Sequence, residues 1–212
     1  MDQRYTMLGA VAAIVGGLAI LAGGVFELMD LGAEEVALSV EAQDASFGLM
    51  VAPFVVGAIA LSIALPALHL HQASRTGSLG VGAFVLAAVG LAFMIGFSFI
   101  FAFVVPTLAT SAPEFLDADD PGPPLAYLFM IGFPLFMLGL LAFAATVVWA
   151  GVFPRWTGWL LVGGMLLDFV GELAESPVSG AFLSGLAFIG MGWRLWQGAT
   201  SGASTMAARS TA

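Results

Sequence analysis

The chain has 212 residues, of which 60% are hydrophobic and only 9% are charged, and its net charge is −9. A soluble domain carries about 25% charged residues, so this composition indicates a surface covered largely by lipid. The acidic balance excludes nucleic acid as a partner, because nucleic-acid binding requires a basic face. The sequence contains no cysteine and no lysine, which excludes disulfides, thiolate metal sites and Schiff-base chemistry.

Long apolar runs follow one another along the whole chain. A helix needs about 20 apolar residues to cross the hydrocarbon core of a bilayer, and each run is close to that length. We therefore predict an all-α, polytopic membrane helix bundle with six transmembrane helices in a single domain, residues 1–197. The predicted spans are 7–27, 48–68, 79–105, 125–150, 156–173 and 178–196. The Ser-, Thr-, Ala- and Gly-rich segment 198–212 is predicted to be a disordered cytoplasmic tail.

The arginines indicate the orientation of these spans. All five basic side chains lie at alternate ends of the apolar runs, whereas thirteen of the fourteen carboxylates lie at or near the other ends. The basic residues are Arg4, Arg75, Arg155, Arg194 and Arg209. Positively charged loops stay cytoplasmic during insertion, so we predict a multi-pass protein of the plasma (inner) membrane with both termini cytoplasmic.

Asp168 is the acidic residue predicted to lie deepest in the membrane. It follows Trp156 by twelve residues, or about 18 Å along a helix, which is past the midplane of a core about 30 Å thick. A carboxylate at that depth usually faces protein or a cavity. Spacings of three and four residues place small and acidic residues on the same helix face, namely Gly164, Asp168, Gly171, Glu172 and Glu175.

The first apolar run has a similar face, which carries Gly16, Ile20, Gly23, Glu27 and Asp30. If the two faces pack together, Glu27, Asp168 and Glu172 converge toward the outer leaflet, with no arginine in reach. The deep acid then either stays protonated or binds a cation through its oxygens, and the identity of any metal stays open. In the alternative interpretation, Asp168 makes one interhelical hydrogen bond, and Glu27 and Glu172 are solvated helix ends.

These residues support one functional hypothesis and one alternative. The hypothesis is the binding or translocation of a proton, a cation or a small solute by the intramembrane carboxylate. The alternative is a non-catalytic membrane subunit or assembly protein whose glycine faces dock a membrane partner or a second copy of the chain. An enzyme is disfavoured and no cofactor is expected, because His69 and His71 point about 200° apart on a helix and are interpreted as solvated side chains at the headgroups.

Two short segments resemble uncharacterised prokaryotic six-helix integral membrane proteins, a class of unknown function. The first is Phe153-Pro154-Arg155-Trp156-Thr157-Gly158-Trp159 with Gly163-Gly164, and the second is Gly192-Trp193-Arg194-Leu195. The resemblance implies a six-helix membrane fold with a tight cytoplasmic turn before the fifth helix. It implies no catalytic residue.

Overall fold

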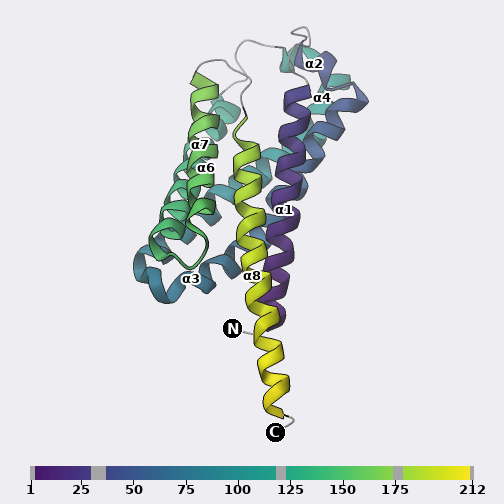
Figure 1. Ribbon diagram of the computed structural model, residues 1–212. Helices are drawn as coiled ribbons and strands as arrows, with labels where there is room; N and C mark the ends of the chain where they lie inside the picture. Colours follow the sequence, from purple (N-terminus) through teal and green to yellow (C-terminus); the bar gives the residue numbers. More distant parts are fainter. Residues whose placement is uncertain (1–2, 30–36, 118–122, 174–178, 211–212) are drawn as a thin grey trace.

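The computed structural model describes residues 3–29, 37–117, 123–173 and 179–210, and all regular secondary structure in these ranges is helical. Five long helices form the body of the molecule (Figure 1): α1 (Gln3–Met29), α3 (Ala45–Phe99), α6 (Pro123–Ala150), α7 (Arg155–Leu173) and α8 (Ala181–Ser210). Four short elements lie at one end: α2 (Leu38–Glu41), the π-helix η1 (Ile100–Val104), α4 (Val105–Ser111) and α5 (Pro113–Leu116). The all-α prediction is confirmed.

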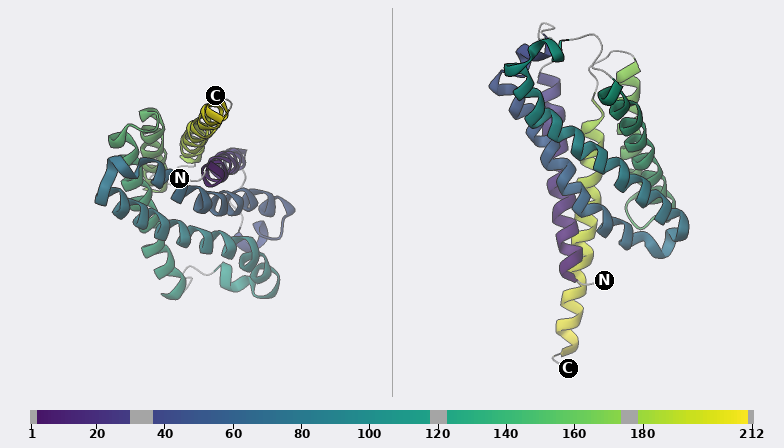
Figure 2. Two further views of the ribbon diagram at one scale, coloured as in Figure 1. Left: turned by 90° about the horizontal axis from the view of Figure 1, so that it is seen from below. Right: turned by 180° about the vertical axis from the view of Figure 1, so that it is seen from behind.

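Two glycines reverse the chain at the end of the molecule opposite these short elements. Gly77, with φ of 54° and ψ of −141°, divides α3 into two helical arms that turn back at a corner (Figures 1 and 2). Gly151, with φ of 59°, ends α6 shortly before α7 begins at Arg155. Both backbones lie in the left-handed region, which glycine adopts without steric penalty. The second turn lies where the sequence predicted a tight turn.

The first arm of α3 contacts the second arm, together with its continuation η1, at two levels. Near the corner, the rings of His69 and Phe84 stack with their centroids 4.7 Å apart. At the far end, Phe47 and Phe101 stack at 6.5 Å, within a small hydrophobic cluster of α2, α3, η1 and α4. The buried members of this cluster are Ala42, Phe47, Val51, Val105 and Ala109. The two contacts therefore bound the space between the arms at both of its ends.

Helix α8 lies between α1 and α7 (Figure 1) and packs against both. Gly17 of α1 faces Gly185 of α8, while Gly16 faces Leu61 of α3. On the other side of α8, Gly164 of α7 faces Ser184. The glycine faces of α1 and α7 are used for close packing, but in the described part of the chain they do not pack against each other. The sequence predicted that Glu27, Asp168 and Glu172 converge if these two faces pack together, and that packing is not found.

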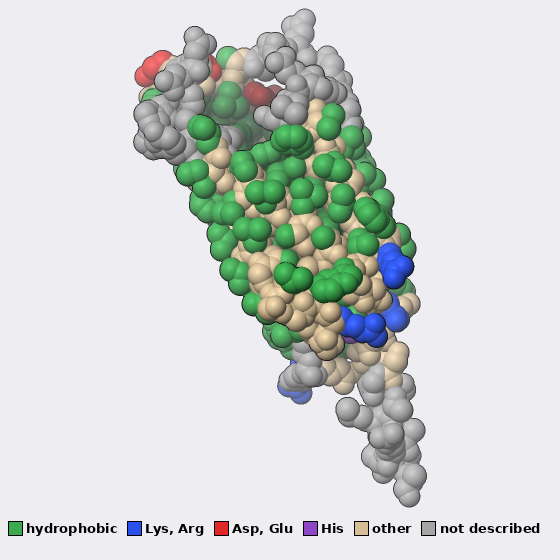
Figure 3. All heavy atoms as spheres, turned by 90° about the vertical axis from the view of Figure 1, so that its left-hand side faces the viewer, with side chains coloured by type: hydrophobic (Ala, Val, Ile, Leu, Met, Phe, Trp, Pro, Cys, Tyr) green, Lys and Arg blue, Asp and Glu red, His purple; other side chains and the backbone are tan. Residues whose placement is uncertain are grey.

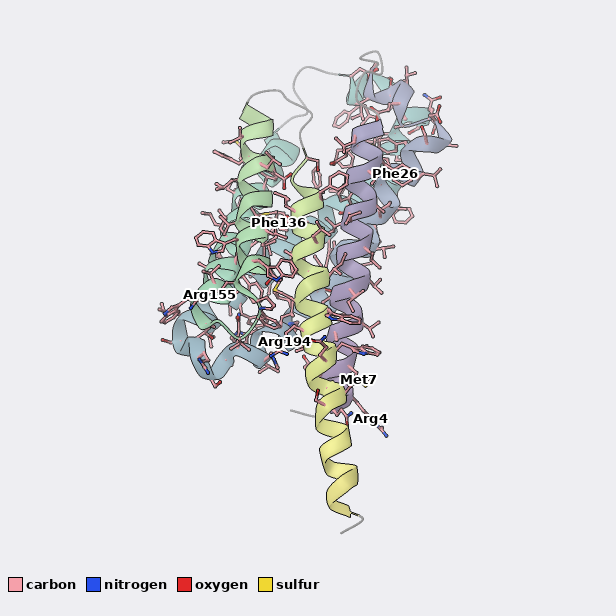
Figure 4. All side chains as sticks on the ribbon, in the orientation of Figure 1. Arg4, Met7, Phe26, Phe136, Arg155 and Arg194 are labelled. Carbon is pink, nitrogen blue, oxygen red and sulfur yellow. The ribbon has the colours of Figure 1, made fainter. Side chains whose placement is uncertain are left out.

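Charged side chains separate toward opposite ends of the molecule. Figure 4 shows Arg4, Arg155 and Arg194 toward the end where both termini lie, which we call the arginine end. In Figure 3 the acidic side chains in view lie at the opposite end, which we call the acid end, and a broad hydrophobic band separates them from the arginines. Large apolar side chains such as Leu8, Leu79 and Leu138 are more than half exposed on the surface. The surface thus has the polarity expected of a membrane protein.

Three helical segments of the described chain are long and apolar enough to cross a bilayer, namely Gln3–Leu28, Ala45–Ser111 and Met130–Ala150. The second has 67 residues, or about 100 Å of helix, which exceeds the hydrocarbon thickness about threefold. It contains two of the predicted runs, joined at Gly77. The structure therefore supports transmembrane helices, and the full set of six spans stays a prediction.

Helix α8 continues to Ser210, beyond Gly198, where we expected a disordered tail to begin. The hydroxyl-bearing residues of this segment favoured a loop in the sequence. In the structure, Thr200 donates to the carbonyl oxygen of Trp196 and Ser201 donates to that of Gln197, so both hydroxyls bond to the preceding turn of the same helix. Gln3 Nε2 also donates to the carbonyl oxygen of Ala199 at 3.2 Å, which joins the start of α1 to α8. Residues 211–212 lie outside the described part of the chain.

Candidate functional site

A pocket of about 540 Å³ lies among the five long helices. Most of its wall is apolar and includes four phenylalanines and three methionines: Phe54, Phe133, Phe136, Phe188, Met50, Met94 and Met165. Its polar side chains are Glu27, Ser98, Asp168, Ser179 and Ser184. None of the described residues that line the pocket is basic. Any positive charge in the pocket would therefore face carboxylates without competition from an arginine of the wall.

The shape of α3 creates this pocket. The first arm supplies Ala58 and Leu61, and the second arm supplies Leu91 and Met94. Leu61 precedes Gly77 by 16 residues (77 − 61), so this wall begins about 24 Å along the arm from the corner. Figure 4 shows Phe136, on α6, between Phe26 and the arginine end. The pocket therefore lies in the body of the bundle, toward its acid end.

Asp168 enters the pocket from α7 and is held by the start of α8. Its Oδ1 accepts a hydrogen bond of 2.6 Å from the backbone N–H of Gly180, the residue before α8. The first N–H groups of a helix have no partner within the helix, so this carboxylate satisfies a donor that would otherwise need one. A negative charge at this position also interacts favourably with the helix dipole.

A close approach of α7 and α8 makes this hydrogen bond geometrically accessible. A methyl group on Gly180 would overlap the carbonyl oxygen of Gly164, so the two backbones are in direct contact at that level. One turn further along α8, Ser184 lies against Gly164. Residues four apart lie on the same face of a helix, so α7 and α8 meet in two successive layers of side chains and backbone. One layer contains Asp168 and Gly180, and the other contains Gly164 and Ser184.

Ser184 is a buried hydroxyl that no described residue binds. The side chain is 3% exposed, and its Oγ has no hydrogen-bond partner. A buried polar atom without a partner typically destabilises a protein by about 1–3 kcal/mol. The neighbouring hydroxyl in the pocket differs, because Ser98 Oγ donates to the carbonyl oxygen of Met94 at 2.8 Å. Ser184 is consequently a lining residue whose hydroxyl, turned toward Gly164, has no hydrogen-bond partner among the described residues.

Glu27 of α1 lines the same pocket as Asp168, although α1 and α7 do not pack together. Its side chain is half-buried rather than a fully solvated helix end. Two of the three predicted acids are thus brought to one cavity. Glu172 lies on α7, but its side chain is outside the described part of the structure, and so is Glu175.

Sequence reasoning missed Gly180 and Ser184. The signal was present, because these two residues share a spacing of four with Gly164 and Asp168. That spacing predicts a small-residue face on α8, but it does not say which helix the face meets. The aromatic wall was also missed, since its four phenylalanines come from three different helices.

The histidines correct another expectation. His69 is buried, with 7% of its side chain exposed, and stacks on Phe84 rather than facing lipid headgroups. His71 lies against Phe153 with the ring centroids 5.3 Å apart. Neither histidine lines the pocket, and the described residues contain no group of three or more histidine, aspartate or glutamate side chains that could hold a metal ion.

No known protein family, curated protein or solved structure matches this chain.

Proposed function

We propose that this chain is a six-helix membrane protein with both termini cytoplasmic, and that it binds or carries a cation or small solute at Asp168. The arrangement of charge supports the orientation, since arginines keep the loops that carry them on the cytoplasmic side. The length of Ala45–Ser111 and its reversal at Gly77 support two crossings by α3. In this proposal the resemblance to uncharacterised six-helix membrane proteins extends to the fold alone.

The observation that carries the proposal is the shared pocket of Asp168 and Glu27. Two carboxylates from separate helices line one cavity, and no basic residue of the described wall neutralises them. Both side chains are only partly exposed, and a carboxylate within a membrane helix bundle is costly and is commonly retained for protons, ions or substrates. A proton or a positively charged solute would relieve the charge of this pair.

The alternative, a non-catalytic subunit or assembly protein, relied on glycine faces that would dock a partner. Those faces are occupied within the chain, because Gly16 packs on Leu61 and Gly164 packs on Ser184. This packing favours the binding hypothesis over the alternative.

The test is the substitution Asp168→Asn in protein reconstituted into liposomes. The asparagine side chain keeps an oxygen that accepts the N–H of Gly180, so the variant is expected to fold, whereas its charge is lost. Flux of protons, Na⁺ and small cationic solutes is measured for the parent and the variant. We expect the variant to lose at least about tenfold of any flux that the parent shows, as for the loss of one hydrogen bond to a charged group.

Glu114→Gln is the matched control, because Glu114 is an exposed acid of α5 outside the pocket. It should leave the flux unchanged. The proposal is wrong if Asp168→Asn conducts or transports like the parent, or if Glu114→Gln causes an equal loss.

A further inference from the structure

We infer that the ligand of this pocket is an organic ammonium ion with a hydrophobic body, rather than a bare inorganic cation. The inference rests on the proposed function and specifies its ligand class. It follows from the size of the pocket, the chemistry of its wall and the places of its polar atoms.

The pocket is larger than an inorganic ion requires. Its volume of about 540 Å³ falls within the range of roughly 300–1,000 Å³ typical of cavities that bind small organic molecules. An unhydrated metal ion would leave most of this space unfilled.

The wall also provides few oxygen ligands. Hard cations such as Ca²⁺ are bound by about 6–8 oxygens. Among the described lining residues the carboxylates are those of Asp168 and Glu27, and Gly180 already occupies one oxygen of Asp168. The absence of a three-ligand cluster in the described chain agrees with this count. The pocket is poorly suited to replace the hydration shell of an inorganic ion.

An organic cation matches the same wall well. The rings of Phe54, Phe133, Phe136 and Phe188 offer apolar contact area, and their faces attract positive charge. The carboxylate of Asp168 supplies the counter-charge. A ligand with a charged head and an aromatic body would therefore bury its body against the phenylalanines while its head reaches α7 and α8.

Ser184 specifies the head group further. Its side chain lines the pocket one helical turn from the layer that contains Asp168, and its unpartnered Oγ is turned toward Gly164. A primary ammonium group carries three N–H donors, so it can donate to Asp168 and, once the Ser184 side chain turns from Gly164 toward the pocket, to its Oγ as well. A quaternary ammonium group has no N–H and leaves the hydroxyl unsatisfied. We therefore assign the site to ammonium ions that carry N–H groups.

Equilibrium dialysis against the protein in lipid nanodiscs tests the inference, with empty nanodiscs as the control for partition into lipid. The organic probes are naphthylmethylammonium, its trimethylated quaternary form and ethylnaphthalene, a neutral molecule of similar shape. Na⁺ and Ca²⁺ are the inorganic probes. We expect naphthylmethylammonium to bind most tightly, ethylnaphthalene to bind no better than to empty nanodiscs, and neither inorganic ion to compete.

Two variants separate the contributions. Asp168→Asn should weaken naphthylmethylammonium binding at least about tenfold, because a hydrogen bond to a charged group is lost. Ser184→Ala should weaken the same probe roughly 2- to 10-fold and leave the quaternary probe unchanged. A uniform loss for both probes would show that Ser184 acts through packing, which would overturn the assignment of the head group.

The remaining outcomes distinguish the inference from the proposed function. Binding of Na⁺ or Ca²⁺ that depends on Asp168, without binding of naphthylmethylammonium, overturns the inference and leaves the proposed function standing. If no probe, organic or inorganic, distinguishes the parent from Asp168→Asn, the proposed function fails and the inference fails with it.

Discussion

The backbone N–H of Gly180 donates to Oδ1 of Asp168 across 2.6 Å, which joins the start of α8 to the polar face of α7. This hydrogen bond forms because the two helices touch at Gly164 and Gly180. The pocket acid is therefore positioned by a helix contact that tolerates no side chain at residue 180.

Gly180→Ala should disrupt this contact. The new methyl group would overlap the carbonyl oxygen of Gly164, so α7 and α8 must separate, at a cost of about 1–3 kcal/mol in stability. Thermal unfolding in mild detergent measures the loss. Gly96→Ala is the matched control, since its methyl group would meet no atom within 4 Å apart from its chain neighbours and its own helix backbone. We expect the control to be neutral or slightly stabilising, because alanine favours helix more than glycine does.

Ser184→Ala should behave in the opposite way. Its hydroxyl has no partner in the described structure, so its removal loses no hydrogen bond, and stability in the absence of ligand should stay the same or rise by up to about 1–3 kcal/mol. Thr146→Val is the contrasting variant, because Thr146 Oγ1 accepts from Gln72 Nε2 at 3.0 Å in a buried setting, and its loss should be destabilising. Equal losses from both substitutions would contradict an unpartnered Ser184.

Single cysteines should report the orientation of the helices, because the chain contains no cysteine of its own. Thr110 is an exposed residue of α4 at the acid end, and Ser74 is exposed near the corner at the arginine end. A membrane-impermeant thiol reagent applied to intact cells should label Thr110→Cys. It should label Ser74→Cys only after the membrane is permeabilised. The reverse pattern would invert the proposed topology.

Asp44 should make the start of α3 sensitive to acid. It is the N-cap residue, and its Oδ1 accepts from the N–H of Ser46 at 2.8 Å and from its hydroxyl at 2.9 Å. The hydrogen bonds from Ser46 lower the pKa of this exposed carboxyl below its ordinary value of 3.8. A lowered pKa in the folded protein means that the stabilisation is fully present above the unfolded pKa and is lost as the pH falls through the folded one.

The difference in melting temperature between the parent and Asp44→Asn isolates this effect. Asparagine also caps helices but does not titrate. We expect the difference to be constant above about pH 5 and to shift against the parent below about pH 4, near the ordinary pKa. A difference that stays constant down to pH 3 would exclude the titration of Asp44 as its cause.

The helical character of the chain could be predicted because the apolar runs are long and continuous. Within the described residues, four of the predicted runs lie inside one helix each, 79–105 continues from α3 through η1 to the first residue of α4, and 178–196 begins shortly before α8. The sequence could not predict that the two arms of α3 meet at Gly77 without a loop, because the polar residues Ser74, Arg75 and Thr76 suggest a loop there. Thr76 is instead buried, and its hydroxyl donates to the carbonyl oxygen of Gln72.

The candidate site could be predicted only in part. The depth of Asp168 along its predicted run singled out an acid that lines the pocket, because that depth depends on residue count alone. Its surroundings depend on which helices are neighbours, and a glycine face predicts a close approach without naming the helix that approaches. The glycine face of α7 packs against α8 and not, as the sequence suggested, against α1. Gly180 and Ser184 of this contact were therefore not predicted as site residues.

The bend at Gly77 has a consequence for biosynthesis. With no loop between them, the two arms of α3 remain hydrogen-bonded as helix up to the corner, and they touch near it through His69 and Phe84. If α3 crosses the membrane twice as proposed, a hairpin of this kind can enter the lipid as one unit, because nearly every backbone group is already paired within its own arm. Arg75, beside the corner, would then anchor the hairpin on the side from which it inserted, and one wall of the pocket would be assembled before α6, α7 and α8 have been made.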